Sequence, residues 1–120
     1  MEFTVPSLLA KRRESAFHAQ NGQCYYCGCA MLKPQFANFI ATDVAQQFDR
    51  QRMCTAEHLQ ARTDGGTDAR KNLVAACWYC NTTRHSRYGG KRPREYRAVV
   101  RRQVMAGVWP TVGERLQSVA

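Results

Sequence analysis

The stretch Thr55–Arg84, TAEHLQARTDGGTDARKNLVAACWYCNTTR, decides how this chain folds. It opens with an acid–histidine pair, Glu57-His58, and closes with a Cys-x-x-Cys pair followed directly by Asn81. Asn72 lies between them, after a loop rich in Gly, Thr and Asp. A short, mixed run over Met53–Leu59 and an apolar run over Leu73–Ala76 flank that loop, and a helical pattern spans Trp78–Tyr88. The stretch therefore predicts a strand, a long loop, a second strand and a helix, in that order.

Two Cys-x-x-Cys pairs, one inside this stretch and one far upstream, predict a metal site. Thiolates bind zinc tetrahedrally, and each pair can supply two of the four ligands. Four sulfurs leave no open coordination position, so we expect a structural zinc; unpaired buried cysteines are the alternative. Cys29 is a spare thiol that can replace Cys27 as a ligand, and Cys54 suits a small buried position. The expected ligands are Cys24, Cys27, Cys77 and Cys80.

Length and charge narrow the possible functions. A chain of 120 residues predicts one domain, residues 1–120, with a limited core that a metal site would help to fold. The 18 Lys and Arg residues exceed the 9 Asp and Glu residues, giving a net charge of +9. This excess favours a polyanionic partner such as nucleic acid, although a merely solvated basic surface is the alternative.

The amino-terminal residues do not suggest secretion. Charged residues interrupt the apolar residues of Met1–Ala19, so we expect no signal peptide, and no segment is long and apolar enough to span a membrane. We therefore expect a cytoplasmic protein. In a reducing compartment, paired cysteines hold zinc more often than they form disulfides.

Three helices are expected outside the central stretch. Ser7 is a suitable N-cap for a helix over residues 8–20, which Asn21-Gly22 would end. Apolar residues at helical spacing predict a second helix over residues 35–48. Pro93 suits the first turn of a basic carboxyl-terminal helix over residues 93–106. The core of the domain would then span about residues 20–90.

The order of these motifs resembles that of a known family. Cys-x-x-Cys, acid–His–aliphatic, Gly-Gly, Asn-Leu-Val and Cys-x-x-Cys-Asn follow one another as in the HNH endonucleases, which belong to the ββα-metal (His-Me finger) superfamily. The resemblance covers roughly residues 20–85. It implies an α+β protein with a small zinc-stapled ββα-metal core and flanking helices. By family analogy, the setting would be a bacterium, a phage or a mobile element.

The residue types suit hydrolysis of a phosphodiester bond. An imidazole titrates near neutrality, so His58 can accept a proton from water. Glu57 and the amide of Asn81 offer the oxygen ligands that Mg²⁺ or Mn²⁺ prefers. In a strand, Glu57 and His58 point to opposite faces unless the strand bends or bulges. The resemblance implies that such an arrangement exists, and that Asn72 holds the loop and so orients His58.

The third residue of the HNH pattern is usually histidine, and here it is Asn81, which makes this chain an HNN variant. His85 lies four residues further on and shares the helix face of Asn81. His85 is therefore either another cation ligand or a phosphate contact. Taken singly, three of the candidate residues also have a structural explanation: His58 as a strand histidine, Asn72 as a turn former and Asn81 as a helix cap. Their joint order between the cysteine pairs favours a catalytic site.

We expect double-stranded DNA as the partner, with arginines contacting its backbone or, as the alternative for each, lying in solvated surface. The expected function is a metal-dependent DNA endonuclease, that is, a phosphodiester hydrolase. The alternatives are a non-catalytic zinc module that binds nucleic acid, a ribonuclease on the same scaffold, and a protein–protein adaptor, which would leave Glu57-His58 unexplained. The expected DNA contacts are Arg84, Arg87, Arg94, Arg97 and Arg101.

Overall fold

The computed structural model describes residues 7–34 and 49–112, and within them it is an α+β structure, as expected. The helix expected over residues 35–48 lies outside the described residues. The other expected strands and helices are present, each within a few residues of its expected bounds. They are α1 (Leu8–Ala19), β1 (Cys54–His58), β2 (Leu73–Cys77), α3 (Trp78–Arg87) and α4 (Pro93–Met105).

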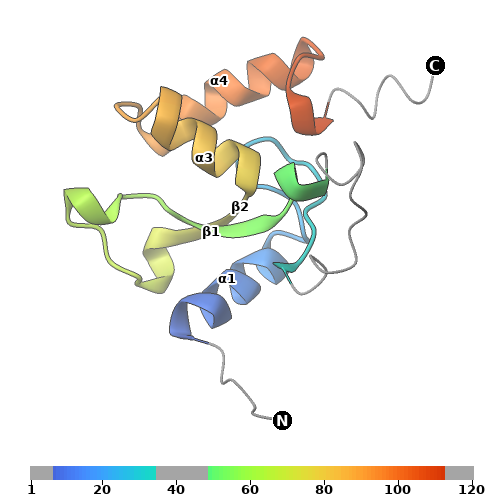
Figure 1. Ribbon diagram of the computed structural model, residues 1–120. Coiled ribbons are helices and arrows are strands. Elements are labelled where there is room, and N and C mark those ends of the chain that lie inside the picture. The colour runs from blue at the N-terminus through green and yellow to red at the C-terminus, as the bar shows by residue number, and fades with distance from the viewer. Residues whose placement is uncertain (1–6, 35–48, 113–120) are drawn as a thin grey trace.

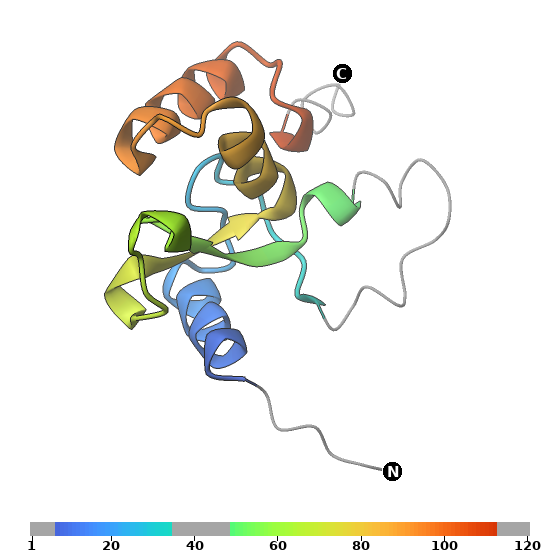
Figure 2. The ribbon, with the colours of Figure 1, turned by 60° about the vertical axis from the view of Figure 1, so that its left-hand side comes forward.

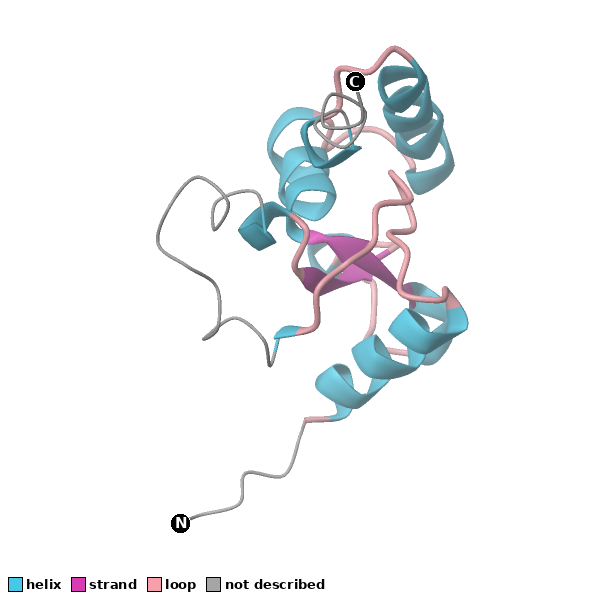
Figure 3. Ribbon diagram, turned by 90° about the vertical axis from the view of Figure 1, so that its right-hand side faces the viewer, coloured by secondary structure: helices cyan, strands magenta, loops and turns pink. Residues whose placement is uncertain are grey.

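The sheet consists of two antiparallel strands with helices on both of its faces. β1 pairs with β2 in a continuous register that runs from Cys54 opposite Cys77 to His58 opposite Leu73. α1 packs on one face and α3 on the other, and α4 lies beyond α3 (Figure 1; Figure 3). The loop between the strands contains two short 3₁₀ helices, Arg62–Asp64 and Arg70–Asn72, which project from one end of the sheet (Figure 2).

The bounds of α1 follow from its end residues. Ser7 caps the helix by accepting a hydrogen bond from the backbone N–H of Ala10 at 3.0 Å. Asn21 and Gly22 then adopt positive φ angles of 54° and 74°, which reverse the chain after the last turn. A left-handed residue of this kind is a common helix stop. The chain is thereby directed into the segment that carries Cys24 and Cys27.

The core is built around the cysteines and a few aromatic rings. The ring centroids of Tyr26 and Tyr96 lie 4.8 Å apart in an edge-to-face contact. The hydroxyl of Tyr96 donates to the backbone carbonyl of Cys80 at 2.8 Å, so α4 is attached directly to the start of α3. Trp109, which follows α4, packs edge to face on Tyr79. Aromatic contacts of this geometry add to the stabilisation that burial supplies.

Among the described helices, none combines the length and the apolar character needed to cross a bilayer.

Candidate metal centre and active site

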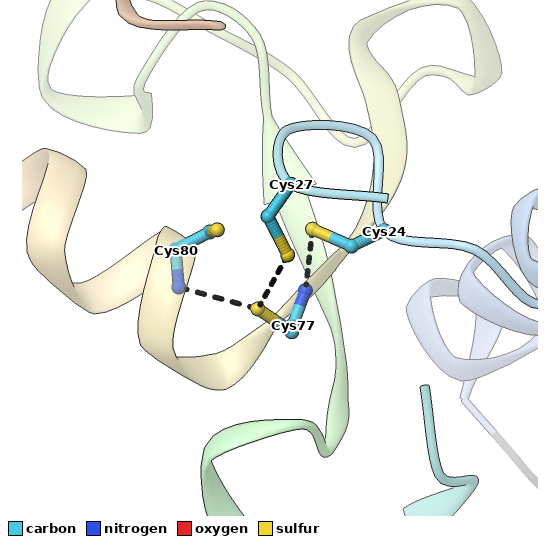
Figure 4. A group of neighbouring side chains, drawn as sticks. All are labelled: Cys24, Cys27, Cys77 and Cys80. Atoms are coloured by element: carbon cyan, nitrogen blue, oxygen red, sulfur yellow. Dashed lines mark hydrogen bonds between the residues drawn. The ribbon is translucent and has the colours of Figure 1, made fainter. Parts of the chain in front are cut away.

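The four cysteines of the two Cys-x-x-Cys pairs meet in one buried cluster (Figure 4). Their sulfur atoms all lie within 4.8 Å of one another, and those of Cys27 and Cys77 are 3.9 Å apart. A tetrahedral zinc ion with Zn–S bonds of about 2.3 Å separates its ligand sulfurs by about 3.8 Å. The spacing and chemistry of this donor set therefore fit zinc. We call these residues the cysteine cluster: Cys24, Cys27, Cys77 and Cys80.

Backbone amides point at the cluster sulfurs. The N–H groups of Tyr26 and Cys77 donate to Cys24 Sγ at 3.4 and 3.3 Å, and that of Cys80 donates to Cys77 Sγ at 3.4 Å. Hydrogen bonds to a charged acceptor favour its charged form, here the thiolate that binds a metal. Cys77 is also the N-cap of α3, so the pairing of β2 and the start of α3 place the second pair.

The two remaining cysteines are buried but do not belong to the cluster. Burial raises the pKa of Cys54 to about 11, so its thiol is neutral and packs as a small apolar group, as the sequence predicted. Cys29 is 1% exposed beside the cluster. The described residues also include Thr111, whose hydroxyl lies 3.2 Å from Cys27 Sγ and which no sequence pattern indicated.

A second group of polar side chains surrounds a pocket of about 350 Å³ at the outer edge of β1. Its walls come from α1, from β1 and the loop that follows it, and from α3. Because the pocket spans the strand edge, both residues of the acid–histidine pair reach it without a bulge in β1. The polar residues that line this pocket, called here the polar pocket, include Glu57, His58, Arg62, Asn81 and His85.

Glu57 is buried, with 1% of its surface exposed, and each of its carboxylate oxygens is hydrogen bonded. Oε2 accepts from the hydroxyl of Tyr26 at 2.9 Å and from Nη1 of Arg84 at 3.1 Å. Oε1 lies 3.0 Å from Nε2 of His85, whose side chain is 44% exposed. One oxygen is thus held inside the protein, and the other faces a partner at the pocket. Burial and the Glu57 charge raise the pKa of Tyr26, so its hydroxyl stays a donor.

Asn81 presents its side-chain oxygen rather than its nitrogen. Nδ2 donates to Thr55 Oγ1 at 3.0 Å and to the carbonyl of Ala56 at 3.3 Å. A carbonyl can only accept, so the nitrogen is the atom that faces β1, and Oδ1 is left for another partner. Together with Glu57 and His85, this amide gives two oxygen donors and one nitrogen donor. The two oxygens are of the type that Mg²⁺ and Mn²⁺ prefer, and the imidazole nitrogen is a ligand more typical of transition metals.

His58 is paired with a residue that the sequence did not indicate. Its Nε2 lies 2.7 Å from Oδ1 of Asp68, in the loop between the strands. Nη2 of Arg62 donates to both oxygens of the same carboxylate, at 2.9 and 3.0 Å. Hydrogen bonds from His58 and from Arg62 lower the pKa of Asp68, so this side chain is a carboxylate at neutral pH. Nothing in the sequence distinguishes it from Asp64 in the same loop.

Asn72 ties the loop to the residues that follow His58. Its Nδ2 donates to the carbonyls of Gln60 and Thr67, at 3.0 and 2.7 Å, and its Oδ1 accepts from the N–H of Gln60 at 2.9 Å. The loop also passes very close to this backbone, because a Cβ added at Gly66 would lie 1.8 Å from the Gln60 carbonyl oxygen. Three side-chain bonds and one glycine therefore fix the path of the chain beyond His58.

The expectation that Arg84 contacts nucleic acid is corrected by its position. Its side chain is 7% exposed, and its guanidinium donates to Glu57 and to the backbone carbonyls of His58, Leu59 and Lys91. A guanidinium surrounded by acceptors of its own protein is not free to contact a phosphate. The physical reason is the buried charge of Glu57, which requires a cationic partner.

The remaining arginines of the expected DNA contacts lie at the surface. Arg94, Arg97 and Arg101 line a shallow hollow of about 350 Å³ on α4, and Arg87 is exposed on α3. The guanidinium of Arg97 stacks 4.8 Å from the ring centroid of Tyr25, and Nε of Arg101 donates to a backbone carbonyl in the Cys24–Cys27 segment. These contacts hold the arginines without neutralising their charge.

Comparison with known proteins identifies the central segment. Residues 45–87 match the family model described as HNH endonuclease. The chain carries an HNH endonuclease motif. No curated protein and no solved structure shows a significant match to the chain.

The HNH match confirms the resemblance that the sequence indicated and supports a nuclease-type function that involves nucleic acid. The matched segment covers less than half of the 120 residues. It includes the polar pocket residues of β1 and α3 and the second cysteine pair, whereas Cys24, Cys27 and α4 lie outside it. In the fold these outer parts complete the cysteine cluster and add a basic surface next to the HNH segment.

Proposed function

We propose that this chain is a divalent-metal-dependent endonuclease that hydrolyses phosphodiester bonds in DNA. The observation that carries the proposal is the convergence of Glu57, His58, Asn81 and His85 on one pocket at the edge of β1. Hydrolysis needs a group that takes a proton from water and a counter-charge for the phosphate, and this pocket offers candidates for both. The HNH match supports the same class of reaction.

In this proposal His58 is the general base. If its Nε2–H donates to Asp68, Nδ1 is the unprotonated ring nitrogen and can accept a proton from water. Asp68 then holds the ring and its tautomer, and it stabilises the imidazolium that forms. Asn72 acts indirectly, because its bonds to Gln60 and Thr67 fix the loop that carries Asp68.

The proposed ligands of the divalent cation are Oε1 of Glu57, Oδ1 of Asn81 and Nε2 of His85. When bound there, a hard cation supplies positive charge that stabilises the phosphate and the departing oxygen. The zinc proposed for the cysteine cluster has no such role, because four sulfurs complete its coordination and the site is buried.

Arginines of α3 and α4 would hold the DNA. Arg87, Arg94, Arg97 and Arg101 are exposed, and the last three line one hollow. Contacts of this kind neutralise phosphates and set the position of the duplex, but they carry no sequence information.

The proposal is tested with a supercoiled plasmid, incubated with the zinc-loaded protein in chelator, in Mg²⁺ and in Mn²⁺. We expect cleavage only with the added cation, and a rate about 10²- to 10⁴-fold lower for His58→Ala. His18→Ala is the matched control, because His18 lies on α1, its side chain is 63% exposed, and among the described residues its ring nitrogens hydrogen bond only to Glu14 and Lys33. A His58→Ala protein that cuts as fast as the wild type would refute the assignment of the base.

One observation favours a second candidate, a zinc-containing module that binds nucleic acid without cutting it. Arg84 already balances the charge of Glu57, and Tyr26 and His85 hydrogen bond to its carboxylate oxygens. The carboxylate therefore has partners for its charge and its oxygens without a cation. Retarded migration of DNA with no nicking under several divalent metals would favour this module.

Assaying duplex DNA, single-stranded DNA and RNA side by side distinguishes a DNase from a ribonuclease.

A further inference from the structure

One buried side chain connects the cysteine cluster with the polar pocket. Tyr26 stands in sequence between the cluster residues Cys24 and Cys27, and it is 0% exposed. Its hydroxyl donates to Oε2 of Glu57 at 2.9 Å. We infer that Tyr26 is a positioning residue that fixes the cation-binding carboxylate relative to the cysteine cluster. The inference rests on the proposed function, since it concerns the same cation site.

The position of the Tyr26 hydroxyl is set by the cluster and by neighbouring rings. The backbone N–H of Tyr26 donates to Cys24 Sγ at 3.4 Å, and its carbonyl accepts from Nε of Arg101. Its ring makes edge-to-face contacts with Tyr25 and Tyr96, with centroids 5.1 and 4.8 Å away. Both the backbone and the ring are therefore fixed, and the hydroxyl has little freedom to follow Glu57 if that carboxylate moves.

The hydrogen bond from Tyr26 gives the two carboxylate oxygens of Glu57 different roles. Oε2 is occupied by Tyr26 and by Arg84, whereas Oε1 faces His85, which is itself a proposed ligand, so Oε1 is the oxygen that a cation would reach. Mg²⁺ and Mn²⁺ suit a single oxygen from each carboxylate, whereas Ca²⁺ also accepts both oxygens of one group. Holding Oε2 therefore favours the smaller cations. Groups that orient a metal ligand in this way typically change metal affinity 10- to 100-fold when they are removed.

The test uses Tyr26→Phe, which keeps the ring and removes only the hydroxyl. Tyr96→Phe is the matched control, because Tyr96 is also 0% exposed and its hydroxyl donates to the carbonyl of Cys80 rather than to Glu57. Mn²⁺ and Ca²⁺ binding to each zinc-loaded protein is measured by titration calorimetry without DNA, and the zinc content is measured alongside.

We expect Tyr26→Phe to bind Mn²⁺ about tenfold more weakly, with a reduced preference for Mn²⁺ over Ca²⁺ and an unchanged zinc content. Tyr96→Phe should bind both cations as the wild type does. Equal Mn²⁺ affinity in Tyr26→Phe and the wild type overturns the inference, and so does an equal loss in both variants, which would mean general loosening of the core.

A second measurement needs no variant and decides the matter if Tyr26→Phe does not fold. In the wild type, the ring-carbon resonances of Tyr26 should move when Mg²⁺ is added, because the acceptor of its hydroxyl then shares charge with the cation; those of Tyr96 should not. Unmoved Tyr26 resonances at saturating Mg²⁺ contradict the inference. If the wild type binds Mn²⁺ but cleaves no nucleic acid, only the proposed function is refuted. If it binds no Mn²⁺, both the proposed function and the inference about Tyr26 are refuted.

Discussion

The cysteine cluster and the polar pocket both draw residues from the ββα segment but satisfy their polar atoms in opposite ways. The cluster brings four buried sulfurs within 4.8 Å of one another, and such donors repel once they are deprotonated. The polar pocket instead gives its ionisable groups partners within the protein: Glu57 is paired with Arg84, and His58 with Asp68. From this difference we expect the fold to depend on a cation at the cluster, and the polar pocket to form before any cation binds.

The largest expected effect is on folding, and it tests the dependence of the cluster on zinc. Structural zinc typically contributes about 10–16 kcal/mol to small zinc domains, as much as or more than the whole stability of a domain this size. Cys77→Ser should therefore unfold at room temperature, as should the wild type after strong chelation. Circular dichroism and zinc content by atomic emission measure this.

The control for that experiment is Cys54→Ala, which removes an equally buried thiol outside the cluster. We expect it to keep its zinc and to lose only about 1 kcal/mol, the usual cost of a small core truncation. Removing Mg²⁺ alone should leave the circular dichroism spectrum unchanged. A Cys77→Ser protein that melts like the wild type would contradict the comparison.

A smaller effect is expected at the polar pocket, where the pair of His58 and Asp68 can be broken without unfolding the protein. Asp68→Asn removes the charge that faces Nε2 of His58 and should lower the plasmid cleavage rate about 10- to 100-fold. Its zinc content and melting temperature should stay close to those of the wild type, because the loop is exposed.

Asp64→Asn is the matched control for Asp68→Asn, because Asp64 lies in the same loop and is exposed, and the hydrogen bond and ion pair of the His58 ring in the described residues go to Asp68. We expect it to cleave at the wild-type rate. An equal loss of rate in both variants would show that loop charge, rather than the pairing with His58, is what the reaction needs.

The smallest effect is expected at the surface arginines of α4, outside both sites. Arg94→Ala and Arg97→Ala should each weaken binding to a labelled duplex and reduce the slope of log K against log salt by about 0.9, the contribution of one phosphate contact. Lys11→Ala, on the opposite side of the sheet on α1, should leave the slope unchanged (Figure 1). Fluorescence anisotropy at several salt concentrations measures this salt dependence of duplex binding. Equal slopes in the wild type and all variants would mean that the DNA does not contact these arginines of α4.

Local patterns were enough to predict much of the fold. The cap at Ser7, the stop at Asn21-Gly22 and the apolar runs on either side of the loop gave α1, β1, β2 and α3 to within a few residues. Such features act between residues close in sequence, so a sequence displays them directly. The extent of the single domain and the catalytic role of each site residue remain predictions.

Other features depend on neighbours that are distant along the chain. Arg84 carries the same charge as Arg87, yet it is buried because Glu57, 27 residues away, lies against α3. Asp68 and Asp64 have similar surroundings in sequence, and only the path of the loop brings one of them to His58.

The sequence by itself determined the donor types and their order: two pairs of thiols, an acid next to a histidine, and an asparagine behind the second pair. It could do so because ligand chemistry belongs to the side chain and not to its surroundings. The tertiary structure alone decided which charged groups are paired inside the protein and which remain accessible to a substrate. This outcome depends on burial and on distances of about 3 Å between groups on different elements, because burying an ionised group costs free energy unless a compensating partner lies next to it.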